Sequence, residues 1–180
     1  MIQLAGFMWA MAFVFGVIGY MRGLSKEMIS LAGIILALFA LFQFDGLLRE
    51  TLLANLPPAQ IFIVQCLIFI GIVFFAYQTN ALGRRQFGNN PEGRDNLQST
   101  VLGAVVGFLN GYLIWGSIWY FMHINGYPLA PYIIAPPPNS PSFDAINSLP
   151  LYILAGGPGG TGNLLALAVI ILFLFVLILI

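Results

Sequence analysis

Residues 101–122 form one uninterrupted apolar stretch, VLGAVVGFLNGYLIWGSIWYFM, which contains no Lys, Arg, Asp or Glu. At a rise of 1.5 Å per residue, a helix of this length reaches about 33 Å, close to the ~30 Å hydrocarbon core of a bilayer. The stretch also lacks the alternation of apolar and polar residues that a strand of a membrane barrel would show. It therefore predicts a membrane-spanning helix.

Four other stretches have the same character, and each is free of charged residues. They comprise residues 4–21, 28–44, 61–80 and 164–180. As helices, the shortest of them reach about 26 Å, which is just enough to cross the hydrocarbon core. We therefore expect an all-α integral membrane bundle of five transmembrane helices.

The composition of the whole chain supports this assignment. Of the 180 residues, 60% are hydrophobic and 7% are charged, whereas a soluble domain carries roughly 25% charged residues. Six Lys and Arg against six Asp and Glu leave no basic patch for nucleic acid. Because Cys66 is the only cysteine, disulfide scaffolds and multi-Cys metal sites are excluded as well.

The positions of the basic residues predict the orientation of the bundle. Arg49 is the only basic residue in the second connection, and the fourth connection has none. Because cytoplasmic connections are enriched in Lys and Arg, we expect the N-terminus outside and, after five crossings, the C-terminus in the cytoplasm. The third connection, residues 78–99, is then a solvated cytoplasmic loop. The other five basic residues lie in the first and third connections and are Arg22, Lys26, Arg84, Arg85 and Arg94.

Two features are expected on the outer side. Residues 45–55 predict a short amphipathic helix that rests on the membrane as a linker, with Asp45 as its cap and with Arg49 and Glu50 turned away from its leucines. Aromatic side chains near the outer helix ends predict an interfacial belt, with packing in the core as the alternative. These aromatic residues are Trp9, Trp115, Trp119 and Tyr120.

The fourth connection, residues 123–163, contains eight of the eleven prolines, so it cannot be helical over most of its length. We expect the bilayer surface, the bundle itself or a neighbouring protein to hold it. Its segment 149–155 is apolar but too short to span, and we expect it to dip into the interface or a partner groove. The chain thus divides into a four-helix membrane domain (1–122), an outer loop (123–163) and a fifth helix (164–180).

Three uncharged polar residues lie at membrane depth, namely Gln65 in the stretch 61–80 and Asn110 and Ser117 in the stretch 101–122. Every acidic residue, by contrast, is expected in a connection. Each polar side chain needs a partner in dry surroundings, so we expect Gln65 and Asn110 to form interhelical hydrogen bonds. A path for a small neutral solute, lined by all three, is the alternative.

Small residues recur every four positions at the start of the stretch 101–122. Such a series opens a groove that lets a second helix approach closely, and the first helix offers small residues at similar spacing. We expect internal helix packing here, with a seam between copies or against a foreign subunit as the alternative. The two series are Ser99, Gly103, Gly107 and Gly111, and Ala12, Gly16, Gly19 and Gly23.

The sequence offers little material for catalysis. His123 is the only histidine, and no G-x-S-x-G elbow accompanies His123 and Asp144 in the outer loop. We therefore expect neither an enzyme nor a cofactor. The weaker alternatives are an enzyme that depends on His123, and a haem or chlorophyll ligated by this histidine from one side.

The first two helices are joined by the segment RGLSKE, which runs from Arg22 to Glu27. Gly23 permits a tight hairpin, and Glu27 can neutralise Arg22 or Lys26 near the membrane surface. This segment is either a determinant of topology or a cytoplasmic docking point.

The hairpin segment and the glycine series together resemble the colicin V production protein family of small bacterial membrane proteins. The resemblance covers roughly residues 4–122. It rests on R-G-x-x-x-E after the first helix and on L-G-x-x-x-G-x-x-x-G in the later helix. The residues that carry these motifs here are Arg22, Gly23 and Glu27, followed by Ser30-Leu31, and Leu102, Gly103, Gly107 and Gly111.

The chain departs from the family pattern at two places. An Asp-Arg pair often precedes the glycine series in the family, where this chain has Ser99 and Thr100, and an Arg commonly precedes the third glycine, where it has Asn110. The family is usually described with four spans, so the Pro-rich loop and the fifth helix are additions. The resemblance implies the bacterial inner membrane and a role in envelope maintenance or export, without an established catalytic chemistry.

Our preferred interpretation is a non-enzymatic structural or accessory subunit that packs against other membrane proteins in a larger complex, surrounded by lipids. The fifth helix and the outer loop are then expected to face the partners. A channel or carrier for a small neutral solute is the second interpretation. Contacts with a pigment or a quinone stay open.

Overall fold

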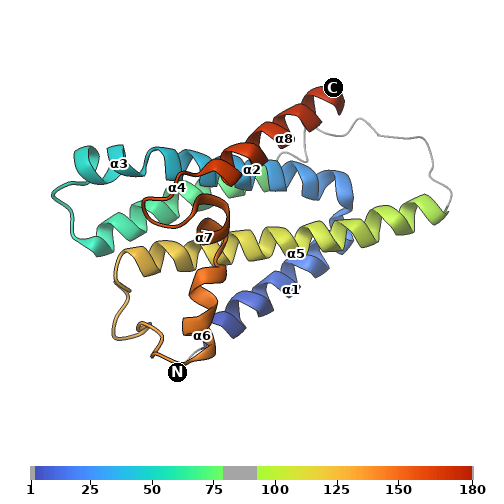
Figure 1. The fold of residues 1–180 in the computed structure, drawn as a ribbon. Helices are drawn as coiled ribbons and strands as arrows, with labels where there is room; N and C mark the ends of the chain where they lie inside the picture. Colours follow the sequence, from blue (N-terminus) through green and yellow to red (C-terminus); the bar gives the residue numbers. More distant parts are fainter. Residues whose placement is uncertain (1–2, 79–92, 180) are drawn as a thin grey trace.

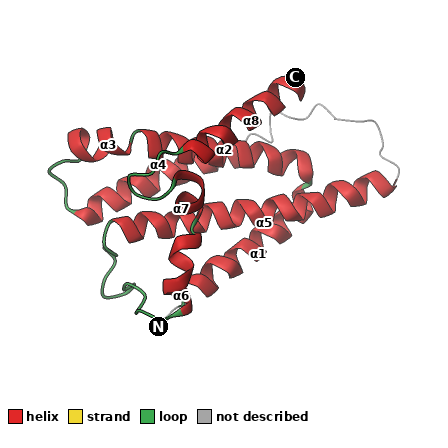
Figure 2. Cartoon of the chain, in the orientation of Figure 1, coloured by secondary structure: helices red, strands yellow, loops and turns green. Residues whose placement is uncertain are grey.

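The computed structural model describes residues 3–78 and 93–179, which form helices, turns and loops without a strand (Figure 1, Figure 2). Four helices are long and apolar enough to cross a membrane. The expected all-α membrane fold is thereby confirmed. The four long helices are α1 (Leu4–Arg22), α2 (Leu24–Gln43), α4 (Pro58–Gln78) and α5 (Gly93–Ile124).

Helix α5 lies at the centre of the bundle. In Figure 1, α1 runs along one side of α5 and α2 along the other, while α4 packs mainly on α2. The contact between α1 and α5 is the most extensive in the described part of the chain. A continuous core of buried apolar side chains connects all four helices, and it includes Met8, Ile34, Leu38, Phe69 and Leu113.

The connections between these helices differ from one another in length. A single residue, Gly23, separates α1 from α2, and its φ of 81° lies in the region that glycine adopts without strain. Helix α5 begins at Gly93, within the predicted loop 78–99, so the end of that loop is helical. Residues 79–92, including Arg84 and Arg85, lie outside the described residues.

The segment after α2 is helical, as the sequence predicts, but it ends earlier. It consists of α3 (Asp45–Leu47) and a short π-helix, η1 (Leu48–Leu52). The expected Asp45 cap does not form. The carboxylate of Asp45 instead accepts hydrogen bonds from Arg49 and from Gln65 of α4, so it faces the bundle.

The connection after α5 is held by the bundle itself. It contains α6 (Pro141–Asp144), a 3-10 turn, η3 (Ala145–Ser148), and α7 (Pro150–Ala155). A Cβ atom at Gly116 of α5 would lie 2.5 Å from Cδ of Pro150, so the proline ring fits against α5 only because residue 116 is glycine. The apolar segment 149–155 therefore packs into the protein.

Helix α8 (Asn163–Leu179) follows and packs on α2 and α7. It is shorter than the four helices that can cross a membrane. The fifth crossing and the orientation with the N-terminus outside therefore remain predictions.

The aromatic side chains near the end of α5 lie in the core. Trp119 is 3% exposed and Tyr120 is 4% exposed, so the interfacial belt is wrong for these two residues and the alternative of core packing applies. The reason is local, because the indole nitrogen of Trp119 donates to the hydroxyl of Tyr127, 3.2 Å away, beneath the outer loop. Trp9, by contrast, is exposed.

Candidate functional site

The last residue of α1 and the first turn of α2 form a buried ion pair. Nη1 of Arg22 lies 2.5 Å from Oε1 of Glu27. The Glu27 side chain is fully buried, whereas that of Arg22 retains 16% exposure. Because Gly23 alone separates the helices, Glu27 falls inside α2, and the expectation that every acidic residue lies in a connection is wrong here.

The other two long helices also contribute to this pair. The amide of Asn110 on α5 donates to Oε2 of Glu27 at 2.8 Å and to its backbone carbonyl at 3.1 Å. The hydroxyl of Tyr77 on α4 donates to the same carboxylate at 3.3 Å, and the Arg22 guanidinium stacks 4.3 Å from the Tyr77 ring centroid. Nη1 of Arg22 also donates to the hydroxyl of Ser30 at 3.3 Å. We call Arg22, Glu27, Ser30, Tyr77 and Asn110 the Glu27 cluster.

The Glu27 cluster joins α1, α2, α4 and α5 at one end of the bundle. A buried ion pair contributes little net stability when it is complete, but loss of one partner leaves a charge without compensation. Asn110 contributes a neutral amide to the cluster, and Arg22 and Glu27 carry its charges. The cluster therefore balances one cation against one anion.

A second polar cluster ties the opposite end of the bundle. Nε of Arg49 donates to both carboxylate oxygens of Asp45, at 2.9 and 3.0 Å. Its terminal nitrogens donate to Oδ1 of Asn125 at 3.1 Å and to Oε1 of Gln65 at 3.4 Å. Gln65 and Asn125 also bond each other at 2.8 Å. We call these four residues the Gln65 cluster.

The Gln65 cluster ties residues 45–55 to the bundle through their charged side chains, which the prediction of an amphipathic linker did not include. Arg49 and Asp45 turn toward α4 and α5, while leucines of the same segment, Leu47 and Leu52, are exposed. A signal in the sequence was available, because Asp45 and Arg49 are four residues apart and Gln65 needs a partner at depth. A cavity of about 690 Å³ adjoins the cluster, and its lining includes Gln65, Tyr120 and His123.

His123 lies near this end but outside both clusters. Its Nδ1 lies 3.3 Å from the Tyr127 hydroxyl, which also accepts from Trp119. Burial raises the pKa of Tyr127 above its ordinary value, so this hydroxyl stays neutral at physiological pH. In the part of the chain that the structure describes, no three His, Cys, Asp or Glu side chains gather as a metal site.

The glycine series lies in the contact between α1 and α5, as the internal-packing interpretation expects. A Cβ at Gly103 would lie 2.6 Å from the carbonyl oxygen of Gly19, and one at Gly107 would lie 2.8 Å from Cα of Gly19. A Cβ at Gly111 would lie 2.8 Å from Cα of Ala12. Because the obstructing atoms are backbone, side chains at these positions would force the two helices apart.

The remaining members of the two series have more room. A Cβ at Gly16 would lie 3.4 Å from the nearest atoms of α5, and one at Gly23 would lie 3.4 Å from the Ser99 hydroxyl. The close approach is therefore concentrated at Gly19, Gly103, Gly107 and Gly111.

Three buried polar atoms on α5 have no hydrogen-bond partner among the described residues, namely Oδ1 of Asn110, Nε1 of Trp115 and the hydroxyl of Ser117. Asn110 and Ser117 are fully buried. Asn110 and Ser117 are seven residues apart, so they share one face of α5. Of the three polar residues predicted at depth, Gln65 and Asn110 form the expected interhelical hydrogen bonds, and Ser117 does not.

Replacement of Ser117 by Ala removes a buried hydroxyl that has no partner. We expect the free energy of unfolding to stay the same or to rise by up to about 2 kcal/mol, because the desolvation cost of the hydroxyl disappears. Thermal unfolding in detergent, followed by circular dichroism, measures this change. A clear loss of stability would mean that the hydroxyl has a partner after all.

Comparison with known proteins places the chain in one family. No match was found among curated proteins or among solved structures. The sequence model described as Colicin V production protein matches residues 6–135, which is well over half of the chain. The match includes both motifs and ends within the Pro-rich connection, so α6, α7 and α8 lie beyond it. The four long helices and the matched region together show that this chain is a multi-pass membrane protein of the colicin V production protein family.

Proposed function

We propose that this protein is a non-enzymatic subunit that packs beside other integral membrane proteins in the bacterial inner membrane. The family name supports a process of envelope maintenance or export. Both polar clusters are charge-balanced and bonded within the bundle, which is the arrangement of a stable scaffold. The surface left for partners is then apolar.

The outward face of α4 carries this proposal. Ile63, Leu67, Ile70 and Phe74 are between 49% and 66% exposed, and they follow one another at intervals of four, three and four residues. This is the spacing of a helix that packs lengthwise against another helix. Gly71 lies next to this row, and nothing stands within 4 Å of the Cβ it lacks. The row and the open glycine together fit a second membrane helix.

Replacement of Gly71 by Phe tests the proposal. Because nothing lies within 4 Å of a Cβ at this position, the side chain has room to extend into the space beside the row. We expect the wild-type chain to leave native membranes in mild detergent as part of a larger assembly. The Gly71→Phe variant should retain at least about fivefold less of the partner, since such overpacking costs about 1–3 kcal/mol. Co-purifying proteins are quantified by mass spectrometry.

The matched control is Val14→Phe on the exposed face of α1, which should leave the assembly intact. Isolation of the wild-type chain solely as a monomer would contradict the proposal. So would a Gly71→Phe variant that keeps its partner.

A second candidate function is a carrier for a small neutral solute. It is favoured by the unpartnered atoms of Asn110 and Ser117 and by the cavity beside the Gln65 cluster. If solute passes along this face of α5, Ser117→Ala should slow its flux into liposomes that contain only this polypeptide. Equal flux in the variant and the wild type would show that Ser117 does not line a path for the solute.

A further inference from the structure

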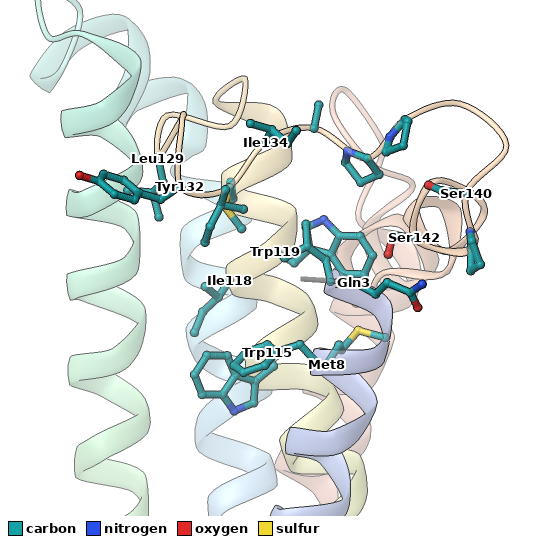
Figure 3. A pocket seen from close by; sticks show the side chains of 18 of the residues that line it. Gln3, Met8, Trp115, Ile118, Trp119, Leu129, Tyr132, Ile134, Ser140 and Ser142 are labelled. Atoms are coloured by element: carbon teal, nitrogen blue, oxygen red, sulfur yellow. The ribbon is translucent and has the colours of Figure 1, made fainter. Parts of the chain in front are cut away.

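A separate cavity of about 660 Å³ lies at the end of the bundle where α1 begins and α5 ends. Figure 3 shows its walls, with Trp115, Ile118 and Trp119 on α5 and Met8 on α1. The chain after α5 forms the roof, where Ile134 and the prolines around it lie above the indole of Trp119 (Figure 3).

The lining of this cavity is apolar over most of its surface and contains no charged residue. Its small polar side chains gather at one end, where Gln3, Ser140 and Ser142 lie together in Figure 3. The cavity thus has a long apolar part and a short neutral polar end. This asymmetry fits an amphipathic molecule whose apolar part is the larger.

The position of the cavity gives it access to the bilayer. Helix α1 packs on α5 and α4 packs mainly on α2, so the face of α5 between them is left for the cavity. Met8 of α1 and Phe62 of α4 line its two sides, and the wall residue Ile118 lies between them on α5. Phe7 of α1 and Leu129 also line the cavity and are 41% and 38% exposed, so the cavity is open to the surroundings of the protein. A lipid chain can enter through this opening.

We propose that this cavity binds an acyl chain of a membrane phospholipid. Its volume lies within the range of small-molecule sites. Apolar cavities of this kind do not hold water well, and unfilled space in a protein interior is destabilising. Because the lining contains no charged residue, it suits the apolar acyl chain of a lipid and not the charged headgroup. Bilayer lipid is also the most concentrated apolar molecule around α1, α4 and α5.

Photolabelling with a phospholipid tests the proposal directly. The probe is a phosphatidylethanolamine that carries a diazirine near the end of one acyl chain, in vesicles with the full-length protein. Trp115 on α5 and Ile133 in the roof both line the cavity and are partly buried, so a chain in the cavity can reach both side chains, while Phe13 faces outward. We expect labelled peptides to include both residues, in addition to the outward residue Phe13. Label confined to outward residues would overturn the proposal.

A cavity-filling variant provides the control. Ile118→Trp fills the wall of the cavity, and we expect it to reduce the label at Ile133 at least about fivefold while the label at Phe13 stays constant. The matched variant Ile170→Trp, on the exposed face of α8, should leave both labels unchanged. Unchanged label at Ile133 in Ile118→Trp would show that no chain enters the cavity.

A second probe distinguishes the source of the chain. A free fatty acid with the same diazirine is compared with the phospholipid probe at equal concentration. Label at Trp115 and Ile133 from the phospholipid supports the proposal. Label at these two residues from the fatty acid alone would overturn the assignment to a phospholipid.

Discussion

Replacement of Arg22 by Met is expected to lower the free energy of unfolding by about 3–5 kcal/mol, because the buried Glu27 carboxylate loses the one cationic partner that it has among the described residues. The donors that remain, the Asn110 amide and the Tyr77 hydroxyl, are neutral and do not replace the charge. Unfolding in mixed micelles, followed by circular dichroism, gives the change. The result would show that the charge of Glu27 is balanced inside the bundle and not at its surface.

Two further variants separate the ion pair from the general effect of losing an arginine. In the Arg22→Met background, Glu27→Gln should restore most of the lost stability, because the unpaired charge disappears. Lys26 is exposed, so Lys26→Met should change stability by no more than about 0.5 kcal/mol. A loss below about 1 kcal/mol in Arg22→Met, or no recovery in the double variant, would contradict the buried pair.

Replacement of Gly107 by Leu is expected to prevent α1 from packing on α5. A Cβ at this position would already lie 2.8 Å from Cα of Gly19, and backbone atoms cannot move aside as a flexible side chain can. We expect a loss of about 3 kcal/mol or more, since the added atoms also need space between the helices. The same unfolding measurement applies, together with the yield of folded protein.

The matched control is the same substitution at Gly71 of α4, where nothing lies within 4 Å of the missing Cβ. Gly71→Leu should leave stability unchanged or raise it by up to about 1 kcal/mol, because leucine favours the helix more than glycine does. If the two substitutions have equal effects, the close approach of α1 and α5 does not depend on glycine.

The sequence predicts the spans well because the bilayer sets both their length and their composition. It also predicts the hydrogen bonds of Gln65 and Asn110, since a polar side chain at depth must find a partner. It does not predict the identity of those partners. Asn110 and Glu27 are 83 positions apart in the sequence, and a local sequence pattern gives no information about a contact between such distant residues.

The errors arise where tertiary packing decides between two faces of a helix. Residues 45–55 are amphipathic in the sequence, but the pattern alone does not say which face meets the bundle, and the charged Arg49 turned inward. Trp119 is buried because the outer loop folds back over the end of α5. That return depends on the fit of Pro150 to Gly116, a pair far apart in the sequence.

The long separation between Glu27 and Asn110 has a consequence for biosynthesis. A ribosome that adds roughly 5–20 residues per second completes the intervening 83 residues in roughly 4–17 s. During that interval the nascent hairpin of α1 and α2 presents an open glycine groove and a carboxylate that still lacks its amide donor. We therefore expect insertion factors and quality-control proteases to act on the hairpin within this period, and the arrival of α5 to end their access.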